Sequence, residues 1–305
     1  FVSFPGPPMK MFRQTVLILV LAGGVVACRQ PSLKQSASPD PAQLPLEDSA
    51  IVMTAETDEE YERRVEALAR YATGVSYEAS NEPERALEEF YRSALADPSD
   101  EAFVLDTSRR LLNNRQTEKA IELLQLASTR PESTGLVHAL LGRAHLLAGN
   151  TNEAIAANVA AIRISPTSIT GYQNLAEIHF EAGRVEDAVK VLEQAARQKK
   201  VDAGYLINIA ETYTRQIQLK PSLMETLKPR AVAILKRASE MNISNTGLQQ
   251  RLADTFAMLG ERSTAARIYE DLLTKYEDFP ILRDPIREKL ANNYLLDGDA
   301  VRAEE

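Results

Sequence analysis

Side chains able to do covalent or metal chemistry are few in this 305-residue chain. The histidines are His138, His145 and His179, and the single cysteine is Cys28. On a helix, His138 and His145 would lie ~10 Å apart along the axis, too far for one ion to bridge without further ligands. One cysteine excludes an internal disulfide and a cysteine-based zinc site. The histidines either pack between helices or bind a metal. We favour packing and predict neither a metal nor a cofactor.

Sequence motifs of common enzymes are missing as well. The chain has no G-x-x-x-x-G-K-[ST] phosphate loop, no G-x-S-x-G nucleophile turn and no H-E-x-x-H zinc helix. Its net charge of −8 comes without a cluster of lysine and arginine, which argues against nucleic acid as the main partner. We therefore expect a protein that is not an enzyme.

The residues around Cys28 predict a specific use for its thiol. A short basic start precedes an apolar run of about a dozen residues, which is too short to span a bilayer but typical of a secretory signal. The end of this run, Val25–Val26–Ala27–Cys28, resembles the bacterial lipobox. The resemblance implies that residues 1–27 are a lipoprotein signal peptide, that cleavage follows Ala27, and that lipid on Cys28 anchors the protein. The alternatives are an ordinary signal or an uncleaved anchor with an incidental cysteine, or a cytoplasmic protein whose start has been misread.

Two further expectations concern the N-terminal region. Residues 1–8 precede the first methionine, so we expect them to be upstream read-through. Arg29 stands where retention in the inner membrane would usually show Asp, so the lipoprotein resemblance favours the outer membrane, facing the periplasm. Residues 28–56 are rich in Pro, Ser and Gln and are expected to form a flexible, disordered tether with a reach of ~30 Å.

The elements that would position any binding residues follow from an internal repeat. Alanines recur every 34 residues, with a nine-residue insertion before Ala231 and four extra residues before Ala303; the series is Ala86, Ala120, Ala154, Ala188, Ala231, Ala265 and Ala303. Five of the seven repeats also have a small residue after a large aliphatic one, as in Leu141–Gly142, whereas unit two has Thr107–Ser108 there; most repeats have Gly or Asn at a turn. Two antiparallel helices per repeat explain this pattern, because small residues allow close approach and glycine allows positive φ.

These residues resemble the tetratricopeptide repeat, which has a 34-residue period. The resemblance implies an all-α fold, a right-handed α-solenoid of about seven helix-turn-helix repeats over residues 57–305. The units are expected at 67–100, 101–134, 135–168, 169–202, 203–245, 246–279 and 284–305. Thr57 and Glu60 predict a capping box at the first helix. In unit five the insertion either lengthens the helices or forms a loop around Pro221. Unit seven stops inside its second helix, so we expect the natural C-terminus to lie further on.

The same resemblance implies a partner-binding groove lined by the first helix of each unit. The candidate groove residues are Tyr71, Val75, Leu105, Arg109, Arg143, Leu146, Gln173, Glu177, Phe180, Ile207, Glu211, Gln250 and Asp254. Their charges form a stripe that is basic in units two and three and acidic in units four to six. This stripe either orients a bound peptide, or Arg109 and Arg143 only pair with acids of neighbouring units.

The function predicted from these features is a non-catalytic scaffold for protein–protein interaction, anchored by lipid in the bacterial envelope. The expected partner is a protein or peptide bound in the groove, and the membrane is contacted through the N-terminal lipid. An alternative is a regulatory or positioning segment of a larger enzyme or assembly whose other domain lies beyond residue 305.

Overall fold

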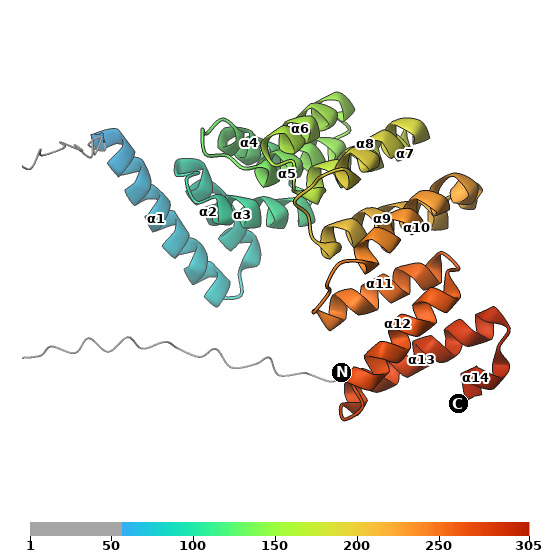
Figure 1. Ribbon diagram of the computed structural model, residues 1–305. Helices are drawn as coiled ribbons and strands as arrows, with labels where there is room; N and C mark the ends of the chain where they lie inside the picture. The colour runs from blue at the N-terminus through green and yellow to red at the C-terminus, as the bar shows by residue number, and fades with distance from the viewer. Residues whose placement is uncertain (1–56, 305) are drawn as a thin grey trace, which may run out of the picture. The chain divides into compact units, whose positions relative to one another are not determined.

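Residues 57–304 are described by a computed structural model and contain fourteen α-helices, one 3₁₀ helix and no strand. The helices form seven successive hairpins (Figure 1). The first helices of the hairpins are α1 (Asp58–Ala79), α3 (Glu101–Asn113), α5 (Gly135–Leu147), α7 (Ile169–Glu181), α9 (Ala203–Leu219), α11 (Thr246–Met258) and α13 (Pro280–Asp297). The second helices are α2 (Pro83–Ala96), α4 (Thr117–Ser128), α6 (Thr151–Ile164), α8 (Val185–Ala196), α10 (Met224–Ser239), α12 (Arg262–Lys275) and α14 (Ala300–Glu304). The expected all-α solenoid is confirmed.

Helix α1 begins at the predicted capping box. The Thr57 hydroxyl accepts a hydrogen bond from the backbone N–H of Glu60 at 3.2 Å, and the Glu60 carboxylate accepts one from the backbone N–H of Thr57 at 2.9 Å. These bonds satisfy two donors that a helix start otherwise leaves unpaired.

The repeated alanines are buried between the helices of the array. From Ala86 to Ala265 every member of the series is at most 1% exposed, whereas Ala303 near the end of the last hairpin is partly exposed. Gly142 shows how tight the approach is, because a β-carbon added there would meet the Asn158 side chain at 2.2 Å. A larger residue at these positions would push the two helices apart.

Turns within the hairpins use positive φ in six of the seven units. Glycine provides it at Gly149, Gly183, Gly260 and Gly298, and Asn81 has φ of 60°. Unit two has Arg115 at this place, with φ of 59°, so this turn keeps its conformation despite the steric cost of a β-carbon.

The insertion in unit five lengthens its helices. Helix α9 has 17 residues and α10 has 16, and a short 3₁₀ helix, η1 (Pro221–Leu223), joins them. Of the two alternatives from the sequence, the structure therefore shows longer helices around a compact turn at Pro221.

The apolar core of the described residues divides into two clusters. One runs from Leu87 to Ala157, through units one to three, and the other from Tyr172 to Tyr294, through units four to seven. The clusters meet where α6 faces α7, and the two helices approach closely there: a β-carbon on Gly171 would lie 3.1 Å from the side chains of Ala161 and Ile162.

The expected signal peptide, Cys28 and the whole of the tether lie outside the described residues. The chain divides into two units, residues 1–54 and 55–305, and all helices named above belong to the second. Among residues 57–304, no helix is both long enough and apolar enough to cross a bilayer.

Candidate functional site

The candidate groove residues lie on the first helices of the hairpins, at equivalent positions of successive repeats. Three of the apolar candidates are buried: Leu105, Phe180 and Ile207 are at most 6% exposed. They pack inside the helical layers, so they leave almost no surface for a partner, and we remove them from the set of contact residues. Tyr71 and Val75 are exposed, and Leu146 is half-buried.

The acidic candidates in units four to six form ion pairs with basic residues of the next unit. The Arg215 guanidinium of α9 donates to the Glu177 carboxylate of α7. Arg251 of α11 donates two hydrogen bonds to Glu211 of α9, at 2.6 and 3.0 Å. Each acid is thus neutralised across a repeat boundary.

Asp254 of α11 continues this pattern in unit six. Its carboxylate accepts from Lys289 Nζ of α13 at 2.7 Å and from the Tyr269 hydroxyl at 2.6 Å. Burial and the bond to this carboxylate raise the pKa of Tyr269, so its proton stays in place. Together, these pairs form a ladder along the first helices of units four to seven.

The two uncharged polar candidates, Gln173 of unit four and Gln250 of unit six, differ in their contacts. Gln173 Nε2 donates to the Asn208 carbonyl at 3.3 Å and to the Thr212 hydroxyl at 3.0 Å, which ties α7 to α9. Gln250 is half-buried on α11. Most of the acidic half of the predicted stripe therefore serves contacts between repeats.

The basic half of the stripe is different. Arg109 on α3 and Arg143 on α5 are both exposed, and within residues 57–304 neither forms an ion pair or a hydrogen bond through its side chain. Pairing with acids of neighbouring units, the alternative from the sequence, is not seen for either arginine in this part of the chain. The neighbouring Arg110, by contrast, pairs with Glu78 at 2.5 Å and with Asp106 at 2.8 Å.

Exposed leucines flank Arg143 on the same side of α5. Leu136 is 43% exposed and Leu147 is 59% exposed, and both lie within one or two helical turns of Arg143 on one face. We define the basic face as Arg109, Leu136, Arg143 and Leu147. The two leucines were not predicted as site residues from the sequence. Their spacing of seven and four residues from Arg143 was the signal that could have identified them.

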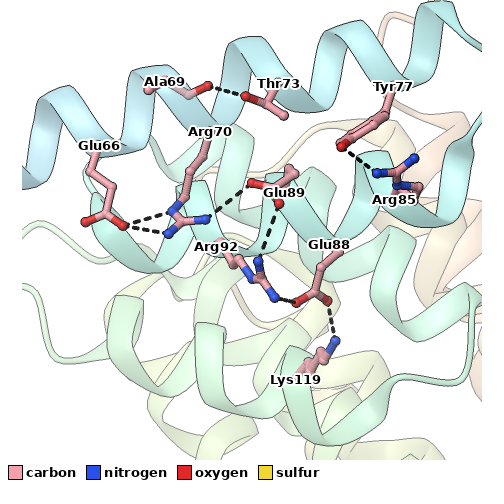
Figure 2. A network of polar contacts seen from close by, with 10 residues as sticks. All are labelled: Glu66, Ala69, Arg70, Thr73, Tyr77, Arg85, Glu88, Glu89, Arg92 and Lys119. Atoms are coloured by element: carbon pink, nitrogen blue, oxygen red, sulfur yellow. Dashed lines mark hydrogen bonds and ion pairs between the residues drawn. The ribbon is translucent and has the colours of Figure 1, made fainter.

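Many charges between the first hairpins are paired with one another. Figure 2 shows a network in which Arg92 pairs with both Glu88 and Glu89, at 2.9 and 3.4 Å. Lys119 of α4 contacts Glu88 at 2.5 Å and lowers the pKa of that carboxyl. Some arginines of the first three hairpins outside the basic face also lack an ion pair or a side-chain hydrogen bond within residues 57–304: Arg63, Arg115 and Arg163. The basic face is therefore distinguished by two arginines at equivalent positions of adjacent repeats beside exposed leucines.

The histidines pack as side chains of the array. His145 is 7% exposed. His179 accepts a hydrogen bond from Arg184 Nε at 3.1 Å, and burial together with this cation lowers the pKa of His179. Burial, together with Arg163, also lowers the pKa of His138. Within the described part of the chain, no group of His, Cys, Asp and Glu has the geometry to hold a metal ion.

Comparison with known proteins identifies the repeats. Two family models, both described as tetratricopeptide repeat, match residues 105–169 and 145–206. Residues 105–206 hold tetratricopeptide repeats. Their general use as a scaffold for binding other proteins agrees with an exposed, unpaired face on these repeats. A search among curated proteins finds no match.

Solved structures with a related arrangement of helices are numerous. A tetratricopeptide repeat protein from Thermus thermophilus is 18% identical with a TM-score of 0.40, covering 62% of this chain and 98% of that chain. The C-terminal part of a repeat protein from Cytophaga hutchinsonii is 15% identical with a TM-score of 0.44, covering 76% of this chain and 91% of that chain. A third, from Parabacteroides merdae, is 20% identical with a TM-score of 0.41, covering 66% of this chain and 75% of that chain.

Proposed function

We propose that this protein is a non-catalytic scaffold, anchored in the bacterial envelope by lipid on Cys28, that binds an acidic segment of a partner protein on the basic face. The observation that carries the binding part is the state of Arg109 and Arg143, which are exposed and unpaired on adjacent repeats while acids further along the array are neutralised.

The chemistry of the basic face specifies the partner segment. Two guanidinium groups favour carboxylates, with which arginine forms paired hydrogen bonds. Leu136 and Leu147 beside Arg143 add apolar contacts, so the segment should carry acidic side chains together with large apolar ones. A basic segment would be repelled by the two arginines, and this repulsion gives the face its specificity.

Reversal of both charges tests the binding part. In the variant Arg109→Glu with Arg143→Glu, we expect affinity for acidic, leucine-containing peptides to fall by at least about tenfold, because attraction becomes repulsion. Fluorescence anisotropy with labelled peptides measures this. The matched control is Arg267→Glu with Arg287→Glu, two exposed arginines outside the basic face. Equal affinity of the two variants for these peptides would contradict the proposal.

The anchor part has a separate test. The lipobox sequence at Cys28 supports transfer of a lipid to its thiol, and acyl chains contribute ~0.8 kcal/mol of membrane affinity per buried methylene. We expect intact-mass spectrometry of the membrane-extracted protein to show acylation at Cys28. We also expect Cys28→Ala to move the protein out of the membrane fraction. An unmodified cysteine in the extracted protein would refute the anchor and leave the binding proposal standing.

A further inference from the structure

Helix α1 carries an exposed apolar seam. The seam consists of Tyr61, Val65, Leu68, Ala72, Val75 and Ala79, and all six are exposed. At roughly 100° per residue, these positions centre about 130° around the helix from Ala67 and Gly74, the two residues that α1 buries in the array. The first helices of units two and three have arginine where α1 has Val75.

The spacing of the seam is that of a coiled coil. Successive members are separated alternately by four and three residues, which is the a and d pattern of a heptad repeat over nearly three heptads. A helix that only covers the core of its own domain needs one apolar stripe, and α1 has a second. This second stripe fits another helix of the same kind.

The seam is complementary to itself when two copies run antiparallel. Pairing around residue 70 places Tyr61 opposite Ala79, Val65 opposite Val75, and Leu68 opposite Ala72, so that large side chains face small ones in two of the three layers. Each layer joins an a position to a d position, as antiparallel coiled coils require. A parallel pairing in register would instead stack Tyr61 on Tyr61 and Ala79 on Ala79. The alternation of large and small side chains along the seam therefore selects the antiparallel form.

We propose that α1 is a homodimerisation helix and that two copies of this chain associate through antiparallel pairing of the α1 seam. This inference goes beyond the proposed function, because it concerns a different helix and a different partner. Since one helix pair buries a small area, the dimer should be of micromolar affinity and reversible.

Sedimentation velocity over a concentration series tests the association. The full chain carrying Cys28→Ser is expected to shift from monomer to dimer as concentration rises. Leu68→Glu in that chain should weaken association by at least about tenfold, because two carboxylates enter the seam. Leu68 is 65% exposed, so the substitution leaves the core intact. The control is Leu219→Glu, at a leucine 68% exposed on α9, which should dimerise normally. A chain that stays monomeric, or a Leu68→Glu variant that dimerises normally, overturns the proposal.

Cross-linking tests the orientation. Without Cys28, a single cysteine at Ala69→Cys lies next to its own copy in the antiparallel pair, and a short bismaleimide should link the two chains. The matched control is Ser76→Cys, which should not link to itself but should link to Glu62→Cys when the two variants are mixed. Efficient linking of Ser76→Cys to itself would refute the arrangement. The peptide affinity of Leu68→Glu should equal that of the unsubstituted chain, so failure of this inference leaves the basic face untouched.

Discussion

At the scale of single residues, the array depends on pairs of small and large side chains facing each other within a hairpin. Gly142 of α5 faces Asn158 of α6, and Gly74 of α1 faces Phe90 of α2. Asn158 is fully buried, and its side-chain amide donates to the Ala154 carbonyl at 2.8 Å, so it has little freedom to move. The size of the residue on the first helix therefore sets the distance between the two helices.

Gly142→Ala is expected to destabilise the protein. The added β-carbon meets the Asn158 amide, and crowding of this kind costs about 1–3 kcal/mol, which exceeds the gain of ~1 kcal/mol in helix propensity. Urea denaturation measures the change. Gly204→Ala in α9 is the control, because a β-carbon there would have no neighbouring atom closer than 3.3 Å. We expect this variant to be no less stable than the unsubstituted protein. A Gly142→Ala variant as stable as the unsubstituted protein would show that the Asn158 side chain can move aside to accommodate the added β-carbon.

At the scale of helices, each element begins where a local signal places it, and its charges then decide what it contacts. Asp100, Asp202 and Asn245 cap α3, α9 and α11 through side-chain oxygens that accept from backbone N–H groups. Ion pairs, such as that between Glu88 of α2 and Lys119 of α4, link neighbouring helices (Figure 2). Pairing of this kind between neighbouring hairpins makes stability depend on pH.

Lys119→Gln is expected to raise the pKa of Glu88 towards its ordinary value of 4.5, because the hydrogen bond from Lys119 is the main cause of its lowered pKa. A carboxyl with a lowered pKa stabilises the fold above its ordinary pKa, and this contribution is lost as pH falls through the lowered value. The variant should therefore lose less stability on acidification. NMR titration of the Glu88 carboxyl checks the shift, and Lys236→Gln, remote from Glu88, is the control. If the pKa of Glu88 were unchanged in the variant, Arg92 and not Lys119 would be the main cause of its lowered pKa.

At the scale of the whole described array, the two core clusters predict two folding units. The buried apolar residues of units one to three and of units four to seven form separate clusters, and between them Asn174 Nδ2 of α7 donates to the Ala139 carbonyl of α5 at 2.9 Å. Repeat arrays unfold in parts when an interface between repeats is weak relative to the repeats themselves.

Truncation of a buried leucine in each cluster tests this division. Leu123→Ala and Leu192→Ala both remove a fully buried side chain, and each should cost about 2–5 kcal/mol. We expect Leu123→Ala to accelerate amide hydrogen exchange in units one to three, and Leu192→Ala in units four to seven. Uniform acceleration throughout the array in both variants would show a single cooperative unit instead.

Much of the fold could be predicted from the sequence because its determinants are local. A 34-residue period of alanines, small residues beside large ones, and glycines at turns describe a hairpin that must stack on its copies, and the helices follow this pattern from α1 to α14. The capping box at Thr57 is equally local, since it involves residues three positions apart. The lipobox at Cys28 is a prediction of the same local kind, and it rests on the sequence alone.

The tertiary structure decided which candidate residues remain available to a partner. Glu177 and Arg215 are 38 residues apart in the chain, and no local pattern shows that they meet. Burial of Ile207 likewise depends on the stacking of α9 against neighbouring helices. Charge and apolarity are properties of a residue, but whether they are satisfied depends on neighbours brought together by folding. For this reason the sequence could predict which face of each first helix lines the groove. Only the packed array could show that Arg109 and Arg143 stay unpaired on it.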